Sequence, residues 1–160
     1  MPELISSSVR RGVLGMGYTG RSVAQYWQAQ GIPFIAMDTR ADLGNDLTLR
    51  RELHGIETYF GEIGESVLRQ VDLLIASPGI AMDSEVIGLA QSLNIEVRGD
   101  IDLFVSEAQA PVIGITGSNG KSSVTTFVGQ LLTASGLTVS VGGNLGTPAL
   151  DLLNDEVDVF

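Results

Sequence analysis

Short apolar runs alternate with amphipathic segments along the chain as far as Gly99. Such runs, bounded by Gly, Pro or polar residues, predict buried strands, and apolar residues three or four positions apart predict helices packed on a sheet. Strands are expected at residues 13–14, 34–37, 57–60, 71–76 and 95–97. Helices are expected around Val23 to Trp27 with a stop at Gly31, and at residues 47–53, 65–70 and 84–93, the last capped by Asp83 or Ser84.

A second pattern follows a charged segment at residues 99–110, which ends in Gln-Ala-Pro and predicts a short helix that links two sheets. Beyond it we expect a strand at 112–115, a helix from Lys121 to Gly136, a strand at 139–141, a helix at 148–153 and the start of a strand at 157–160. One face of the 121–136 helix is apolar, formed by Val124, Phe127, Val128, Leu131 and Leu132. The predicted fold class is α/β, with one domain at 1–99 and a second unit at 100–160.

The stretch Val-Ile-Gly-Ile-Thr-Gly-Ser-Asn-Gly-Lys-Ser-Ser at 112–123 predicts strand, phosphate loop and helix. Glycines let the backbone approach phosphate closely, a helix amino terminus attracts anions, and Lys121 and Ser122 stand where a P-loop places its phosphate lysine and magnesium ligand. The spacing is a variant of the usual pattern, and an ordinary Gly-rich turn is the alternative. Because Lys121 is the only lysine of the chain, we favour phosphate binding. The predicted ATP-phosphate residues are Gly117, Ser118, Asn119, Gly120, Lys121, Ser122 and Ser123.

A second Gly-rich turn, Gly15-Met16-Gly17-Tyr18-Thr19-Gly20, follows the first predicted strand and has the form G-x-G-x-x-G. Asp38 ends the next strand eighteen residues beyond Gly20, close to the position of the ribose-binding acid in a Rossmann fold. These residues alone fit NAD as well as another nucleotide. An NAD(P)-binding oxidoreductase or sensor module, with Arg40 on a 2′-phosphate, therefore remains an alternative, as does a purely structural role for the glycines.

Ser77-Pro78-Gly79 follows the strand predicted at 71–76. Ligands of open α/β sheets bind at the carboxyl ends of the strands, and backbone amides in this turn are suited to a phosphate or a uracil oxygen. A plain strand-to-helix connection is the competing interpretation.

Charge and composition exclude several classes of function. The net charge of -10 and the pI near 4.3 argue against a nucleic-acid surface and against a polybasic membrane patch. Cysteine is absent, and the chain shows neither a signal-peptide pattern nor an apolar stretch that could span a bilayer, so we expect a cytoplasmic protein. The sole histidine, His54, and the carboxylates Asp100, Asp102 and Glu107 are expected to be solvated rather than catalytic.

The loop Gly-Ile-Thr-Gly-Ser-Asn-Gly-Lys-Ser-Ser, followed by Gly142-Gly143-Asn144-Leu145-Gly146, resembles the Mur ligases of peptidoglycan synthesis. Met37-Asp38-Thr39-Arg40, Ala76-Ser77-Pro78-Gly79-Ile80 and Gly99-Asp100-Ile101-Asp102-Leu103-Phe104 resemble the D-glutamate-adding branch of that family. The resemblance runs from about Val13 to Phe160 but covers only part of the family's three-domain chain. It implies a Rossmann-like substrate-binding domain at 1–99, followed by a linker and the truncated start of a P-loop ATPase domain at 100–160.

The resemblance also implies the ligands. The first domain would hold the uridine diphosphate of UDP-N-acetylmuramoyl-L-alanine through Tyr18, Thr19, Asp38, Thr39, Arg40, Ser77, Pro78 and Gly79. In the family the asparagine at the position of Asn144, in the second unit, also faces this substrate. ATP with Mg²⁺ on Ser122 would phosphorylate the substrate carboxylate, and D-glutamate would attack the resulting acyl phosphate. The family's magnesium-binding glutamate and histidine, carbamylated lysine, adenine pocket and D-glutamate domain lie beyond Phe160, so no catalytic residue is assigned. We expect a monomer, inactive by itself.

Overall fold

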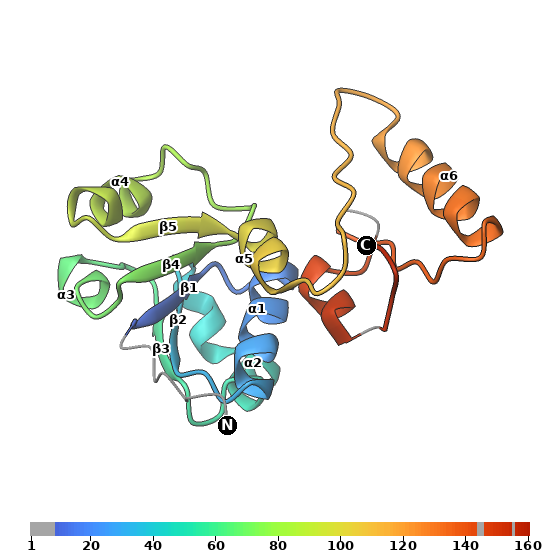
Figure 1. The fold of residues 1–160 in the computed structure, drawn as a ribbon. Helices are drawn as coiled ribbons and strands as arrows, with labels where there is room; N and C mark the ends of the chain where they lie inside the picture. Colours follow the sequence, from blue (N-terminus) through green and yellow to red (C-terminus); the bar gives the residue numbers. More distant parts are fainter. Residues whose placement is uncertain (1–8, 144–145, 155) are drawn as a thin grey trace. The chain divides into compact units, whose positions relative to one another are not determined.

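The computed structural model describes residues 9–143, 146–154 and 156–160 (Figure 1). The chain forms two compact units, one that ends at Gly99 and a second, Asp100–Phe160. Among the described residues, no helix is long and apolar enough to cross a membrane.

The first unit is built on one sheet of five parallel strands in the order β3-β2-β1-β4-β5. The strands are β1 (Arg11–Leu14), β2 (Phe34–Asp38), β3 (Glu57–Phe60), β4 (Leu73–Ala76) and β5 (Glu96–Gly99). The register places Val13 of β1 beside Ala36 of β2 on one side and Ile75 of β4 on the other. The three middle strands are almost wholly buried while both edge strands are partly exposed. Parallel strands covered on both faces favour unbroken apolar runs, and the predicted α/β sheet is confirmed.

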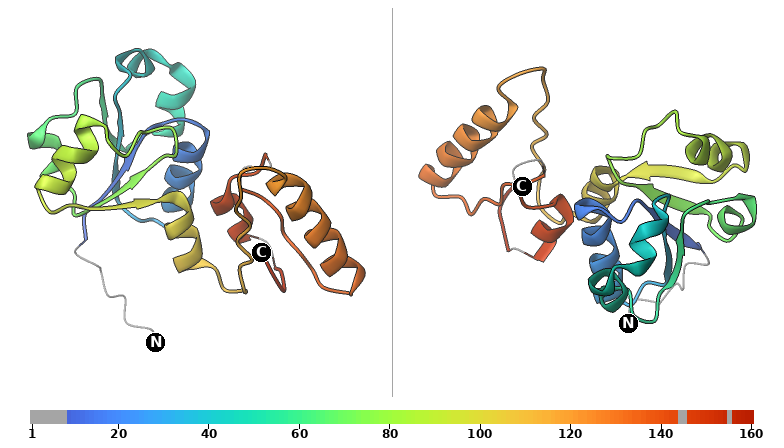
Figure 2. Two further views of the ribbon diagram at one scale, coloured as in Figure 1. Left: turned by 90° about the horizontal axis from the view of Figure 1, so that it is seen from above. Right: turned by 180° about the vertical axis from the view of Figure 1, so that it is seen from behind.

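Helices cover both faces of this sheet, with α1 and α2 on one face and α3 and α4 on the other (Figures 1 and 2). Their bounds are α1 (Tyr18–Ala29), η1 (Ala41–Asn45), α2 (Leu47–Glu52), α3 (Glu65–Leu68) and α4 (Glu85–Ser92). Trp27 anchors α1, with its ring centroid 5.5 Å from that of Phe34. The start of α2 is fixed by Asp46, whose carboxylate accepts the amides of Thr48 at 2.8 Å and Leu49 at 3.1 Å.

Several boundaries in this unit differ from the predicted ones. The 3-10 turn η1 was not predicted, α3 ends at Leu68 rather than near residue 70, and β4 begins at Leu73 rather than at residue 71. Ser84 occupies the N-cap position of α4 with an extended backbone, but its side chain makes no capping bond. These ends depend on tertiary contacts that periodicity does not record.

The second unit contains α5 (Asp100–Glu107), α6 (Lys121–Ala134) and the 3-10 segment η2 (Ala149–Asn154). Helix α5 packs against η2, and Phe104 meets Phe160 edge-on with ring centroids 5.2 Å apart. Leu150, Leu152 and Val159 are also buried.

The strand predicted at 112–115 does not form. Val112 is 37% exposed and Ile113 46% exposed. Ile113 N–H donates to the Phe160 carbonyl, and Phe160 N–H donates to the carbonyl of the preceding Pro111, both at 2.9 Å. The strands predicted at 139–141 and 157–160 reduce to one parallel bridge between Val139 and Val159, and the helix predicted at 148–153 is the 3-10 segment η2. A strand needs a ladder of hydrogen bonds to at least one neighbour, and in the described part of this unit the pairing is limited to this single bridge and the bonds to Phe160.

Helix α6 forms where predicted, but its apolar face is uncovered. Val124, Phe127 and Leu131 are 51%, 62% and 56% exposed. Spacings of three and four residues put these three side chains on one side of the helix. The described residues of the second unit therefore contain the predicted helix without the sheet on which it was expected to pack.

Candidate functional site

The strand order of the first unit creates a switch point between β1 and β4. From β1 the chain proceeds to β2 and β3 on one side, and then returns to place β4 on the other side of β1. In open parallel sheets, loops at the carboxyl ends of such strands turn to opposite faces and leave a ligand crevice between them. Here those loops are the Gly15–Gly20 turn after β1 and the Ser77–Gly79 turn after β4.

The turn after β1 requires glycine at both of its ends. Gly15 has φ +93°, and a Cβ on Gly20 would lie 1.8 Å from the Gly15 carbonyl oxygen. The intrahelical bonds of α1 begin with Arg21 N–H to the Gly17 carbonyl at 3.0 Å, and no side chain caps the helix. The amides of the first helical turn therefore point toward the amino end of α1, an arrangement that suits an anion.

Asp38, at the end of β2, is only 1% exposed and receives four hydrogen bonds. Its carboxylate accepts the Met16 amide at 2.6 Å and the Arg40 amide at 2.9 Å. It also accepts Arg40 Nε at 2.9 Å and Arg40 Nη2 at 2.7 Å. Burial works to raise the pKa of Asp38, but the hydrogen bonds from Arg40 and Met16 outweigh it, so the net pKa is lowered and the carboxyl stays ionised.

Ser77, at the end of β4, connects the two loops. Its side chain is buried, and its hydroxyl donates to the Gly15 carbonyl at 2.7 Å. Its amide donates to the Leu14 carbonyl at 2.9 Å. The turns after β1 and β4 are thus tied to each other across the switch point.

The predicted substrate residues divide into exposed and buried groups. Those at least partly open to solvent at the carboxyl ends of β1, β2 and β4 are Tyr18, Thr19, Thr39, Arg40, Pro78 and Gly79. Asp38 and Ser77 lie beneath them, and their side chains form hydrogen bonds within the protein. Asn144 lies outside the described residues.

Sequence reasoning did not single out Met16, whose amide is held by Asp38. It also did not predict that Arg40 would form an ion pair and hydrogen bonds with the Asp38 carboxylate. One available signal was the spacing of two residues between Asp38 and Arg40, because side chains two apart in an extended chain lie on the same side.

The predicted phosphate loop of the second unit leads into α6 through Gly120, which has φ +76°. The first intrahelical bond runs from Val124 N–H to the Gly120 carbonyl at 2.9 Å, so the preceding amides of α6 have no acceptor inside the helix. The exposed Lys121 folds back over the loop and donates from Nζ to the Gly117 carbonyl at 2.5 Å. Left-handed glycine, open amides and a lysine at one helix start fit a phosphate group.

Carboxylate or histidine ligands for a metal are not gathered in the described part of the chain, where no group of three or more His, Cys, Asp or Glu is suitably placed. The Ser122 hydroxyl, predicted as the magnesium ligand, is exposed at the start of α6.

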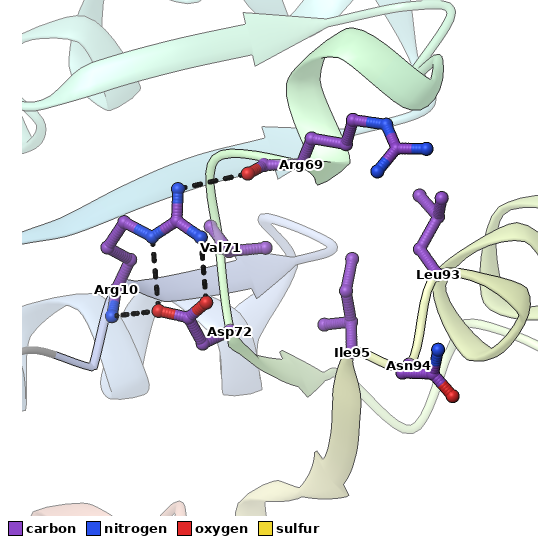
Figure 3. Close-up of a pocket in the computed structure, with 7 residues that line it drawn as sticks. All are labelled: Arg10, Arg69, Val71, Asp72, Leu93, Asn94 and Ile95. Atoms are coloured by element: carbon purple, nitrogen blue, oxygen red, sulfur yellow. Dashed lines mark hydrogen bonds and ion pairs between the residues drawn. The ribbon is translucent and has the colours of Figure 1, made fainter.

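A cavity of about 300 Å³ opens at the other edge of the sheet, near the amino ends of β4 and β5 (Figure 3). It is lined by Arg10, Arg69, Val71, Asp72, Leu93, Asn94 and Ile95. Arg10 pairs with Asp72 at 2.7 Å and also donates to the Arg69 carbonyl at 3.0 Å, while the Arg69 guanidinium is paired with Glu65. With both cations engaged, and on the edge away from the strand carboxyl ends, this cavity is the weaker candidate for a ligand site.

Relatives of known identity match nearly the whole chain. UDP-N-acetylmuramoylalanine--D-glutamate ligase of Pseudomonas syringae pv. syringae (strain B728a) is 45% identical over 158 residues, which are 99% of this chain and 35% of that protein. The enzyme of the same name from Escherichia coli (strain K12) is 43% identical over 148 residues, or 92% of this chain and 33% of that protein. The chain thus spans about a third of the length of these relatives.

Solved structures of Mur ligases share the fold. A pseudomurein peptide ligase type C from Methanothermus fervidus is 25% identical, with a TM-score of 0.54 over 94% of this chain and 32% of that one. UDP-N-acetylmuramate-alanine ligase from Thermotoga maritima is 20% identical, with a TM-score of 0.51 over 84% of this chain and 32% of that one. Residues 10–99, which hold the whole switch point, match the model of the N-terminal domain of MurD-like Mur ligases. The chain therefore belongs to the MurD-like branch of the Mur ligase family.

Proposed function

We propose that the first unit binds the uridine diphosphate part of UDP-N-acetylmuramoyl-L-alanine at the carboxyl edge of β1, β2 and β4. The observation that carries this proposal is the switch point, where the Gly15–Gly20 turn and the Ser77–Gly79 turn are hydrogen-bonded to each other and the N-cap residue of α1, Gly17, makes no side-chain capping bond. Pyrophosphate suits that helix end. Tyr18, Thr19, Thr39, Arg40, Pro78 and Gly79 are the exposed residues that would surround the ligand, with Asp38 and Ser77 beneath them.

The state of Asp38 favours this ligand over a dinucleotide cofactor. A Rossmann enzyme uses the acid at this position to accept the ribose hydroxyl of NAD. A carboxylate has about four acceptor positions, and here four hydrogen bonds from Arg40 and Met16 fill them. The ribose hydroxyl would have to displace a donor from a buried, charge-assisted pair.

For the second unit we propose that the loop from Gly117 to Ser123 holds the phosphates of ATP. The amides at the start of α6 and the charge of Lys121 would neutralise phosphate oxygens. Ser122 would supply a hydroxyl ligand to Mg²⁺, which when bound offsets negative charge on the nucleotide. The left-handed Gly120 and the exposed lysine support this assignment.

For the complete protein we propose an ATP-dependent, cytoplasmic, monomeric ligase that adds D-glutamate to UDP-N-acetylmuramoyl-L-alanine. The names of the relatives support that substrate pair. A carboxylate has no good leaving group, so amide formation requires its prior activation, and we propose that ATP activates it by transferring a phosphoryl group to give an acyl phosphate. Positioning of ATP, UDP-substrate and amino acid together is the protein's main contribution, so the present residues alone are expected to form no amide.

Calorimetric titration of the chain with UDP, UDP-N-acetylmuramoyl-L-alanine, NADH and NADPH tests the binding proposal. We expect heat of binding with both uridine ligands and none above dilution with either dinucleotide. Saturable NADH or NADPH binding without a response to UDP would overturn it in favour of a dinucleotide-binding module.

A further inference from the structure

Two polar residues predicted to contact the ligand have almost no surface to offer it. Asp38 is 1% exposed and Ser77 is 8% exposed. Every polar atom of the Asp38 side chain accepts hydrogen bonds from the protein, and the Ser77 hydroxyl proton is donated to Gly15. A phosphate offers acceptors, so contact with it would require the Ser77 hydroxyl to give up its bond to Gly15, and a ligand hydroxyl could reach the Asp38 carboxylate only by displacing a donor that it already holds.

Both residues instead act on a single peptide group, the one that joins Gly15 to Met16. Asp38 accepts the amide of Met16, and Ser77 donates to the carbonyl of Gly15. They reach the turn from opposite sides of β1, since β2 and β4 are its two neighbours in the sheet. The Gly15 amide donates in addition to the Met37 carbonyl at 2.7 Å.

Packing around this turn is equally constrained. A Cβ on Gly20 would lie 2.7 Å from the Ser77 hydroxyl oxygen, and one on Gly15 would lie 3.1 Å from the Ser77 Cβ. The turn thus packs against Ser77 so closely at Gly15 and Gly20 that a side chain at Gly20 would displace the Ser77 hydroxyl.

We propose that Asp38 and Ser77 are positioning residues that clamp the Gly15–Met16 peptide group by holding its two ends, and so fix the amino end of α1 in place for a pyrophosphate, without contacting the ligand. This inference rests on the proposed uridine diphosphate site and assigns a different role to two of its residues. Arg40 completes the clamp by holding the Asp38 carboxylate with its backbone and guanidinium. Because the turn is already ordered in the free protein, ligand binding does not have to include the entropic cost of ordering the turn.

Ser77→Ala tests the clamp, because it removes the hydroxyl, keeps the Cβ and leaves Arg40 untouched. Its matched control is Ser92→Ala, since the Ser92 hydroxyl also donates to a backbone carbonyl, that of Leu89 at 2.7 Å, but in a helix outside the site. We expect Ser77→Ala to weaken UDP binding about fivefold to tenfold, as for one lost buried hydrogen bond, and to change uridine binding less than about twofold, both measured by NMR titration. Ser92→Ala should change neither.

Amide exchange without any ligand separates positioning from contact. Ser77→Ala and Asp38→Asn should both speed exchange of the Met16 amide in the free chain. The control for the second variant is Asp72→Asn, which removes a similar Arg–Asp pair and amide acceptor at the other edge of the sheet. It should leave the Met16 amide unchanged.

Unchanged Met16 exchange in Ser77→Ala and Asp38→Asn would overturn the clamp, as would an equal loss of UDP and uridine binding in Ser77→Ala. If the unaltered chain fails to bind UDP, the proposed ligand is wrong. The exchange comparison then still judges the clamp on its own.

Discussion

A Cβ added to Gly20 would lie 1.8 Å from the carbonyl oxygen of Gly15. That carbonyl is backbone, is bonded to Ser77 and cannot rotate away, so helix α1 approaches β1 as closely as it does only because residue 20 lacks a side chain. The third glycine of the G-x-G-x-x-G pattern, Gly20, therefore permits the close packing of the α1 amino terminus against the end of β1.

Gly20→Ala should accordingly destabilise the first unit, by about 3 kcal/mol or more, because neither backbone can yield without strain. Gly88→Ala in α4 is the matched control: it is also a helix glycine, but its Cβ would meet no atom within 4 Å. There the gain in helix propensity should stabilise by about 0.5–1 kcal/mol. Urea unfolding followed by circular dichroism measures both, and equal effects of the two substitutions would contradict the close approach.

The Arg10–Asp72 pair should make stability depend on acid pH. Hydrogen bonds from the Arg10 side chain and backbone lower the pKa of Asp72 to about 2, from an ordinary value of 3.8. The unfolded chain therefore takes up this proton first on acidification, and the pair's contribution is present above pH 4 and lost as the pH falls toward 2. Both side chains are about half exposed, so salt should weaken the effect.

NMR titration of the Asp72 carboxyl carbon should give a midpoint near 2 in the unaltered chain, and Arg10→Ala should move it back toward 3.8. A midpoint near 3.8 before the substitution would show that the pair does not persist in solution.

Lys121 should be the one side chain acylated by an acyl-phosphate derivative of ATP, because it is the only lysine. Mass spectrometry should find the label at Lys121, apart from reaction at the amino terminus, and excess Mg-ATP should reduce it. Lys121→Arg keeps the charge and should abolish side-chain labelling. Labelling that ATP leaves unchanged would argue against phosphate binding at this loop.

Hydrogen exchange should be faster in α6 than in the helices of the first unit. Among the residues of α6 only Gly129 is buried, so local opening of this helix loses few apolar contacts. Exchange by mass spectrometry should show strong protection in β1, β2 and β4 and weak protection in α6. Uniform protection along the chain would contradict this picture.

Phe127→Ser should reduce concentration-dependent association without lowering the thermal midpoint of the first unit, since Phe127 is 62% exposed.

Sequence patterns were most accurate for elements whose packing partners are all present in the described part of the chain. The apolar run at 34–37 lies in a middle strand and forms as expected, because its neighbours β1 and β3 are present. The equally apolar run at 112–115 stays irregular, since a strand is defined by neighbours that local composition does not encode. Periodicity likewise found α6 but could not show that its apolar face would remain uncovered.

The site shows the same division. The glycine spacing and the positions of Asp38 and Ser77 at strand ends indicated that these residues would meet at one edge of the sheet, as the structure has them, while nucleotide binding there stays a prediction. Their orientation was beyond sequence reasoning, because whether an aspartate faces a ligand or an arginine two residues later depends on the packed backbone. The direct contacts now proposed are the exposed neighbours of these two residues.

The location of bound UDP tests the account most directly. Amide shifts should be measured by NMR during a UDP titration of the unaltered chain, with the Arg10–Asp72 cavity as an internal control. The account predicts that the largest amide shift changes fall at residues 15–20, 38–40 and 77–80, at the carboxyl edge of the sheet. The amide shifts of residues 69–72 and 93–95 should stay unchanged. Shifts confined to the amino-edge cavity, or spread evenly over both edges, would contradict a uridine diphosphate site at the β1–β4 switch point.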